Sequence, residues 1–251
     1  MHALSSLDLA AAAWFLIAWF GFNFVIDSSP LRKKTLSSAM DAYRRNWMVA
    51  MCTREVRIMD TGIMAGLQQG TAFFASTAFL AIGGGFALLD ATETIVQVAG
   101  DLSIPVADSR ALWEIKVLGL MLIFAYAFFK FGWAYRLFNY ASIVMGAVPE
   151  KGRASMEDIR QIAEKAGDLN VLAGRHFNRG QRAFFFAIGF LGWFAGPIVF
   201  ATTTLAVLLV LLRRQFFSKA RAAVISGQYP ASPLVPKSGE YTETGSSNPF
   251  T

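Results

Sequence analysis

The chain has few of the side chains that bind metals or form covalent cross-links. Its 251 residues include one cysteine, Cys52, and two histidines, His2 and His176. A single cysteine excludes an intrachain disulfide and any cluster of cysteine ligands. The two histidines lie far apart in the sequence and outside the long apolar runs, which argues against a haem held between two membrane histidines. We therefore predict neither a metal nor a cofactor.

Positive charge is missing from the N-terminal segment. The first basic residue is Arg32, which follows a long apolar run, so the chain lacks the positively charged start of a secretory signal peptide. The net charge of +6 raises the possibility of nucleic-acid binding, but the basic residues fall between apolar runs. Positive-inside topology explains that distribution, and we predict no nucleic-acid partner.

Apolar residues, by contrast, are in excess and gathered in runs. The chain is 55% hydrophobic, whereas soluble domains contain roughly 45–50% apolar residues. About 20 apolar residues are needed to cross a bilayer. Four runs are long enough, at about 8–27, 63–89, 112–135 and 183–212. The expected fold is all-α, a polytopic membrane protein with four transmembrane helices.

The distribution of lysine and arginine predicts an orientation. Residues 1–8 have none, 28–62 have seven, 90–111 have one and 136–182 have eight. Because short basic loops stay in the cytoplasm, we predict that the N-terminus is outside and that both basic segments are inside. Four spans then place the C-terminus outside. The five basic residues after position 212 argue against that last step.

The two basic segments each predict an amphipathic helix on the cytoplasmic side. Apolar residues recur at helical spacing from Leu36 to Met51, opposite a basic face. The second segment begins with a capping pattern at Ser155 and Asp158 and continues as an apolar stripe. We predict one integral membrane domain over 1–226. Residues 227–251 are rich in Ser, Pro, Gly and Thr, and we expect this tail to be disordered.

Glycine occurs at every fourth position at the start of the second run. Gly62, Gly66 and Gly70 would share one face of a helix. Small residues at this spacing let two helices approach closely in lipid, so we predict a packing face. A face that makes room for a ligand is the alternative.

The last run offers a similar pair, Gly192 and Gly196, followed by Pro197. Proline inside a helix removes a hydrogen bond and bends the helix. We predict a kinked span in which these residues pack against a neighbour. A cavity lined by the kink is the alternative.

Polar residues within the apolar runs are candidates for function, because an ionisable group at mid-bilayer costs about 3 kcal/mol or more. Asn23 and Asp27 end the first run, and Lys130 lies in the third. We expect Asp27 to meet Lys130 or Arg182 near the inner surface. A lysine that snorkels to the headgroups is the simpler reading of Lys130.

Basic residues also cluster just before the second and fourth runs. If the two segments meet, they form one pocket at headgroup depth, and arginine forks match phosphate. Ordinary positive-inside anchoring is the competing explanation. The candidate residues for an anion or a lipid headgroup are Arg54, Arg57, Asp60, Arg175, His176, Arg179 and Arg182.

Three phrases of the sequence resemble a known family. They are TREVRIMD, FFASTAFLAIGGG and RHFNRGQRAFFFAIGFLGWF. Together they resemble the bacterial membrane-protein family called domain of unknown function 599, over about residues 8–212. The resemblance implies a four-span protein of the bacterial inner membrane. It supplies no activity and no catalytic residues.

These patterns favour a non-enzymatic protein with a transport, channel-like or accessory role, which binds an anionic group at the cytoplasmic surface. No HExxH motif, paired histidines or clear Ser–His–Asp arrangement indicates an enzyme. A lipid-modifying membrane enzyme and a scaffold subunit of a membrane complex are the alternatives. Membrane lipids are the expected partners, and a homo-oligomer or a partner within a membrane complex is left open.

Overall fold

The structure, a computed structural model, describes residues 4–101, 110–150 and 152–225, and these residues form helices and connecting turns without a strand. This confirms the predicted all-α class. The tail expected to be disordered, 227–251, lies outside the described residues. The helices are α1 (Ser6–Asp27), η1 (Pro30–Lys34), α2 (Leu36–Met51), α3 (Ile58–Asp90), α4 (Thr92–Asp101), α5 (Arg110–Gly146), α6 (Met156–Leu191), η2 (Gly192–Ala195), α7 (Pro197–Phe216) and α8 (Lys219–Ile225).

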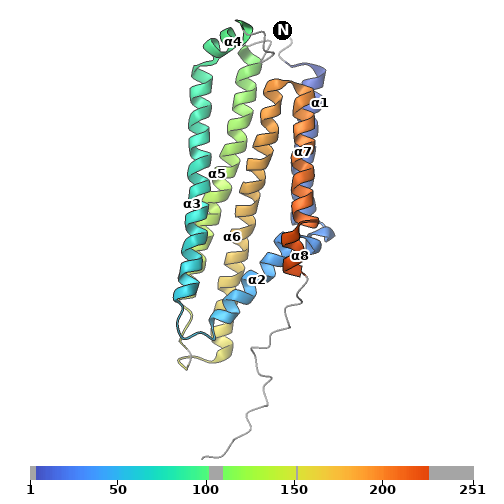
Figure 1. The fold of residues 1–251 in the computed structure, drawn as a ribbon. Helices are drawn as coiled ribbons and strands as arrows, with labels where there is room; N and C mark the ends of the chain where they lie inside the picture. The colour runs from blue at the N-terminus through green and yellow to red at the C-terminus, as the bar shows by residue number, and fades with distance from the viewer. Residues whose placement is uncertain (1–3, 102–109, 151, 226–251) are drawn as a thin grey trace, which may run out of the picture.

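Five long helices run side by side between two ends of an elongated bundle (Figure 1). α3 packs on α5, α5 packs on α6, and α6 packs on α7, with α1 against α7. α2 lies across the lower part of α6 in Figure 1, close to the short α8. We call the end that holds α2, α8 and the α5–α6 turn the basic end. The opposite end holds the start of α1, α4 and the α6–α7 turn.

Four helices of the described chain are long and apolar enough to cross a membrane: α1, α3, α5 and the segment Pro197–Ile225 that begins with α7. The number agrees with the prediction, and the chain is a polytopic helical membrane protein by length and composition. The position of the fourth span differs from the predicted 183–212. α6 also runs from the basic end to the opposite end, but its first half is too polar to be recognised by hydropathy.

The predicted kinked span at 183–212 is a hairpin of two antiparallel helices. α6 ends at Leu191, and after one 3-10 turn Gly196 takes a φ of 123°. A positive φ suits glycine and ends a helix, and Pro197 is then the first residue of α7. The prediction of a kink was wrong because both local signals belong to a helix end and a helix start.

Contacts at both ends of α7 fix the course of this hairpin. Near its start, the Trp193 indole Nε1 donates to Asp8 of α1 at 2.7 Å. Near its end, the hydroxyl of Ser37 lies 3.1 Å from Gln215 Oε1, and Arg221 Nε donates to the carbonyl of Lys34. α7 therefore returns to the basic end, and the expectation that its C-terminal end lies on the same side as the N-terminus is wrong.

The hairpin explains the basic residues that follow position 212, which a C-terminal end outside the cell did not. Arg213, Arg214, Lys219 and Arg221 follow α7 to the basic end, where the residues of α2 and the first half of α6 also lie. Among the described residues, the opposite end carries Arg110 and Lys116, near the start of α5. The basic clusters thus gather at one end, as positive-inside topology requires.

The row Gly62, Gly66 and Gly70 faces away from the bundle. A Cβ atom added at any of the three would meet no heavy atom within 4 Å. α3 instead packs through a seam of one residue every seven, at Met64, Thr71, Ala78 and Gly85. The glycine row therefore makes no close helix contact within the described part of the chain, and packing against another molecule stays a prediction.

Other glycines make the close helix contacts. A Cβ at Gly192 would lie 2.2 Å from Thr203 Oγ1 of α7, so Gly192 makes a close contact inside the segment that was predicted to be one span. Gly196 has nothing within 4 Å, and its role is conformational. At Gly180 and Gly119, an added Cβ would lie 2.6 Å from a buried phenyl ring of α5 and α6, respectively.

Candidate functional site

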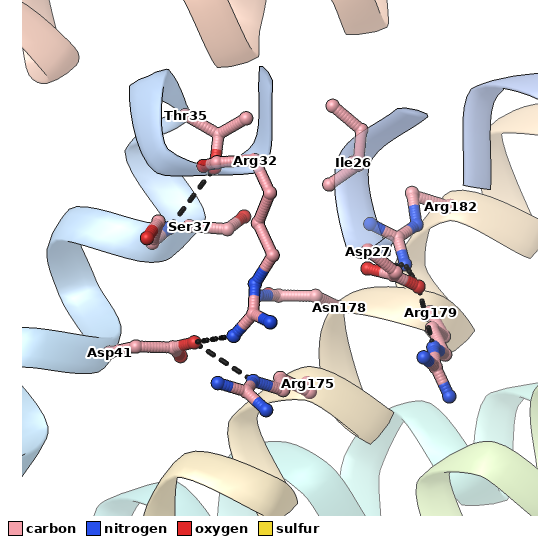
Figure 2. A pocket seen from close by; sticks show the side chains of 11 residues that line it. Ile26, Asp27, Arg32, Thr35, Ser37, Asp41, Arg175, Asn178, Arg179 and Arg182 are labelled. Carbon is pink, nitrogen blue, oxygen red and sulfur yellow. Dashed lines mark hydrogen bonds and ion pairs between the residues drawn. The ribbon is translucent and has the colours of Figure 1, made fainter. Parts of the chain in front are cut away.

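A small polar cavity lies at the basic end, between the end of α1, η1, the start of α2 and the middle of α6 (Figure 2). Its volume is about 60 Å³. A single water needs roughly 10–15 Å³ on this measure, so the cavity has room for a few waters or a group of similar size. It is lined by Ile26, Asp27, Arg32, Thr35, Ser37, Ser38, Asp41, Arg175, Asn178, Arg179 and Arg182. We call it the arginine cavity.

Asp27, the last residue of α1, anchors one side of the cavity. It accepts a hydrogen bond from Arg179 Nε at 2.7 Å and from Arg182 Nη2 at 2.9 Å. The two arginines are three residues apart on α6, a spacing that places them on one face of the helix. The predicted meeting of Asp27 and Arg182 is confirmed.

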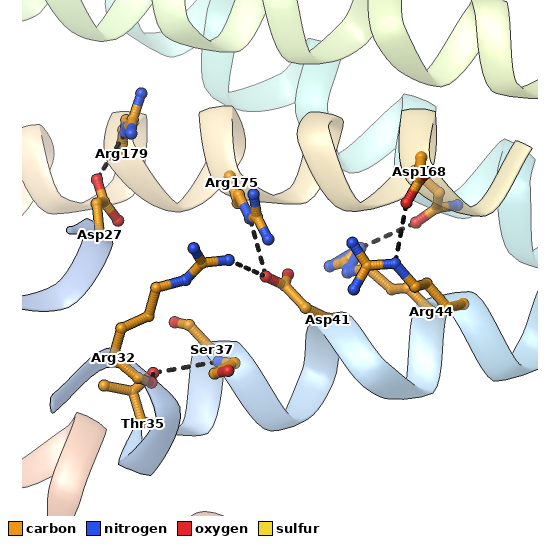
Figure 3. A network of polar contacts seen from close by, with 12 residues as sticks. Asp27, Arg32, Thr35, Ser37, Asp41, Arg44, Asp168, Arg175 and Arg179 are labelled. Carbon is orange, nitrogen blue, oxygen red and sulfur yellow. Dashed lines mark hydrogen bonds and ion pairs between the residues drawn. The ribbon is translucent and has the colours of Figure 1, made fainter. Parts of the chain in front are cut away.

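Asp41 of α2 anchors the other side. Arg175 Nε donates to its Oδ2 at 2.9 Å, and Arg32 Nη2 lies 3.6 Å from the same oxygen. Figure 3 shows this pair of contacts beside the Asp27 contact, along one face of α6. Arg32 and Asp41 were not among the predicted site residues, because neither lies in an apolar run or among the basic residues just before the second and fourth runs.

Positive charge exceeds negative charge around the cavity. Four arginines share two aspartates, which leaves a net charge of 4 − 2 = +2 among the lining residues. Arg182 is only 4% exposed, and its Nε–H has no hydrogen-bond partner among the described residues. A buried donor without a partner is costly, and more so on a charged group. The cavity is therefore suited to an oxygen-bearing anion.

Further contacts hold α2 against α6 next to the cavity. Arg44 Nη1 donates to Asn170 Oδ1 at 3.2 Å, and Arg45 Nε to Asp168 at 2.9 Å. The guanidinium of Arg44 fits because Gly174 has no side chain, since a Cβ there would lie 2.7 Å from Arg44 Cζ. Burial lowers the pKa of Arg44 from its ordinary value, and the nearby Asp41 opposes this shift.

Arg54, Arg57 and Asp60 form a separate group around the start of α3. Asp60 is fully buried and accepts hydrogen bonds from Arg54 and from Trp47 Nε1. Arg57 donates to two backbone carbonyls just after α5, those of Val148 at 2.8 Å and Pro149 at 3.1 Å. These contacts fasten the α2–α3 turn to the α5–α6 turn.

The structure does not bring the two arginine segments together into one pocket. α2 runs antiparallel to α6, with Asp41 beside Arg175 and Cys52 beside Ile159 at its other end. Ile159 precedes Arg175 by 16 residues of α6, or roughly 24 Å at 1.5 Å per residue. About this distance therefore separates the turn after Cys52, which carries Arg54 and Arg57, from the arginine cavity. Of the seven candidates, Arg175, Arg179 and Arg182 line the arginine cavity, whereas Arg54, Arg57, Asp60 and His176 do not.

His176, Lys130 and Asn23 lie near the cavity without lining it. Lys130 Nζ lies 5.1 Å from the centroid of the Tyr126 ring. The imidazole of His176 packs edge-on to Trp133, and its Nδ1 is buried without a hydrogen-bond partner. Asn23 donates to the carbonyl of Trp19 at 2.8 Å, and its Oδ1 is likewise buried without a partner. The roles of Lys130 and Asn23 as intramembrane polar groups stay predictions, whereas His176, a predicted anion ligand, does not line the cavity.

No metal centre is found in the described part of the chain, where no three His, Cys, Asp or Glu side chains lie close enough to share an ion. Cys52 is buried at the end of α2, and burial raises the pKa of its thiol. A protonated, buried thiol is a poor nucleophile. The arginine cavity is therefore the strongest candidate site, as a binding site.

Comparison with known proteins gives a family match. A family model described as "Protein of unknown function, DUF599" matches residues 10–220. The match confirms the resemblance carried by the three phrases and likewise ends before the tail. No match was found among curated proteins or among solved structures.

Proposed function

Since the chain belongs to the DUF599 family, whose description names no activity, we propose its function from the site itself: it is a membrane protein that binds the phosphate or a similar oxyanion of its ligand in the arginine cavity. The ligand is an anionic lipid headgroup or a phosphorylated metabolite. The protein acts in a transport, channel-like or accessory role.

The unpartnered Nε–H of Arg182 carries this proposal. A buried guanidinium with an unused donor, beside three further arginines and only two aspartates, favours an anion. Arginine forks bind phosphate oxygens in pairs, and such charge-assisted bonds are about twice as strong as neutral ones. A phosphorylated metabolite and a phosphate headgroup would both bind these arginines through phosphate oxygens. The binding of soluble phosphate therefore tests the contact that the two ligands share.

We place the basic end in the cytoplasm and the N-terminus outside, in the inner membrane of a bacterium. The gathering of lysine and arginine at the basic end supports this orientation. The arginine cavity then lies at the cytoplasmic surface, at the depth where the apolar α1 ends.

Cysteine labelling in intact cells tests the orientation. In a Cys52→Ala background, we expect Gln97→Cys, at the opposite end, to react with a membrane-impermeant maleimide. Glu157→Cys and Lys219→Cys, both at the basic end, should react only after the cells are opened. Labelling of position 219 from outside would contradict the antiparallel α6–α7 hairpin, and the reverse pattern throughout would contradict the orientation.

A thermal-shift titration tests anion binding. We expect sodium phosphate to raise the Tm of the detergent-purified protein above that in sodium chloride of equal ionic strength. Arg32→Gln should weaken the apparent phosphate affinity about tenfold, because a hydrogen bond to a charged group contributes about 1.5–3 kcal/mol. Arg32 is partly exposed, so we expect this variant to fold.

Arg45→Gln is the matched control, because Arg45 also lies on this face of the protein and pairs with an aspartate outside the cavity. It should leave the phosphate shift unchanged. An equal response of both variants, or no phosphate-specific shift in the wild type, would overturn the proposal.

A further inference from the structure

A second and larger cavity lies between α3 and α5 at the basic end. Its volume is about 470 Å³, within the range of roughly 300–1,000 Å³ that is usual for small-molecule sites. Residues that line it include Met51, Arg57, Met64, Gln68, Ser142 and Met145. It shares no lining residue with the arginine cavity, and we call it the methionine groove.

The groove has one charged end and an apolar middle. Arg57 lies at the start of α3, and Gln68 lies 11 residues further along the same helix. At 1.5 Å per residue the two are separated by roughly 16 Å. Met51, Met64 and Met145 come from α2, α3 and α5, respectively. Methionine side chains adapt to the shape of an apolar guest, so the middle of the groove suits a flexible chain.

The polar groups at the far end satisfy one another. Gln68 Nε2 donates to Asn139 Oδ1 at 2.8 Å, and it lies 3.1 Å from Ser142 Oγ. Their mutual hydrogen bonds leave them with less need for a polar partner in the groove. The far end therefore does not require a hydrogen-bonding ligand.

Arg57 supplies the recognition of charge. Its two terminal nitrogens each donate one bond to a carbonyl, those of Val148 and Pro149. A guanidinium has five N–H donors, so three are left beyond these two bonds. The carbonyl contacts fix the guanidinium at one end of the groove, and no Asp or Glu is among the groove's lining residues.

We propose that the methionine groove binds a long-chain fatty acid, with the carboxylate at Arg57 and the acyl chain along Met64 and Met145. Two candidate membrane spans, α3 and α5, form its walls, so an acyl chain reaches the groove from the bilayer. The inference is independent of the anion site proposed above.

Photolabelling of the full chain in detergent tests this inference. A palmitic acid bearing a diazirine on its chain should label peptides that contain Met64 or Met145. Excess palmitate should suppress the labelling, and excess sodium phosphate should not. Thr61→Trp, at an exposed position of α3 that lines the groove, narrows the groove and should reduce labelling about tenfold, the equivalent of 1.4 kcal/mol.

Met59→Trp is the matched control, because Met59 lies on the same helix, is 57% exposed and does not line the groove. It should leave labelling unchanged. If Thr61→Trp fails to fold, as judged by Tm, then Gly146→Leu, at another exposed lining position, replaces it. Arg57→Gln should weaken competition by palmitate but not by palmitate methyl ester, since the ester lacks the carboxylate. Labelling that is spread evenly over α3, or is equal in wild type and the groove-narrowing variant, would overturn the assignment.

Discussion

Gly180→Leu is expected to lower the stability of the protein by about 3 kcal/mol, the upper end of what overpacking typically costs. A Cβ at Gly180 would lie 2.6 to 2.9 Å from three atoms of the Phe131 ring. Phe131 is fully buried and is held by the rings of Phe74, Phe177 and Phe184, so it has no room to move aside. The loss should appear as a much lower midpoint of thermal unfolding in detergent.

Gly66→Leu is the matched control for this prediction. Gly66 is also a helical glycine, but a Cβ there meets no heavy atom within 4 Å. Because leucine favours helix more than glycine by up to about 1 kcal/mol, the control should be neutral or slightly stabilising. A large loss with Gly66→Leu would show that the outer face of α3 packs against another copy or another protein. Equal small effects from both substitutions would contradict the packing of α6 on α5.

The contrast between these two glycines shows what the sequence could predict about packing. A four-residue glycine spacing locates a smooth helix face, but lipid tails are as apolar as leucine, so composition does not distinguish a lipid-facing side from a buried one. The buried seam of α3 repeats every seven residues and includes Thr71 and Ala78, which are as small as many lipid-facing residues. Only the position of α5 identifies the buried side.

The number of apolar helices was predictable, whereas the antiparallel hairpin of α6 and α7 was not. A run of about 30 residues, longer than one crossing needs, and basic residues after it were both signs of a turn. Gly196 followed by Pro197 marks a helix end and a helix start, but the same pair also occurs in a kinked helix. The hydrogen bond between Trp193 and Asp8 distinguishes the hairpin from a kinked helix. The two residues are 185 positions apart, so no local sequence pattern predicts their contact.

The candidate site was also predictable only where local sequence patterns place its residues. Asp27 ends an apolar run, and Arg182 begins one, so both were expected at the same depth. Arg57 and Arg175 were expected at that depth too. The sequence does not reveal that α2 folds back along α6 and separates these two arginines, because that path depends on contacts such as Asp41 with Arg175.

Asp27→Asn is expected to cost about 3–5 kcal/mol in the absence of added phosphate, the range observed when one partner of a buried ion pair is removed. Arg182 is almost fully buried and would lose the carboxylate that accepts its hydrogen bonds, and Arg179 would lose the same partner. The resulting uncompensated charge should lower the midpoint of unfolding strongly. Asparagine is nearly the same size as aspartate, so packing is preserved.

Asp168→Asn is the control for this substitution. Asp168 also pairs with an arginine across the α2–α6 contact, but the two side chains are 64% and 50% exposed. Exposed ion pairs contribute about 0–1 kcal/mol, so this variant should unfold close to the wild type. A similar loss in both variants would mean that the effect comes from the contact between helices and not from the buried charge.

Added phosphate should restore part of the stability that Asp27→Asn loses. The substitution raises the net charge of the cavity's lining residues from +2 to 4 − 1 = +3 and frees donors on Arg179 and Arg182. A ligand that binds only the folded state stabilises it by RT ln(1 + [L]/Kd), which is about 2.7 kcal/mol at a hundredfold excess over Kd. Phosphate should therefore raise the Tm of Asp27→Asn more than that of the wild type, and more than chloride does at equal ionic strength. A smaller phosphate response in Asp27→Asn than in the wild type would contradict a phosphate group bound beside these arginines.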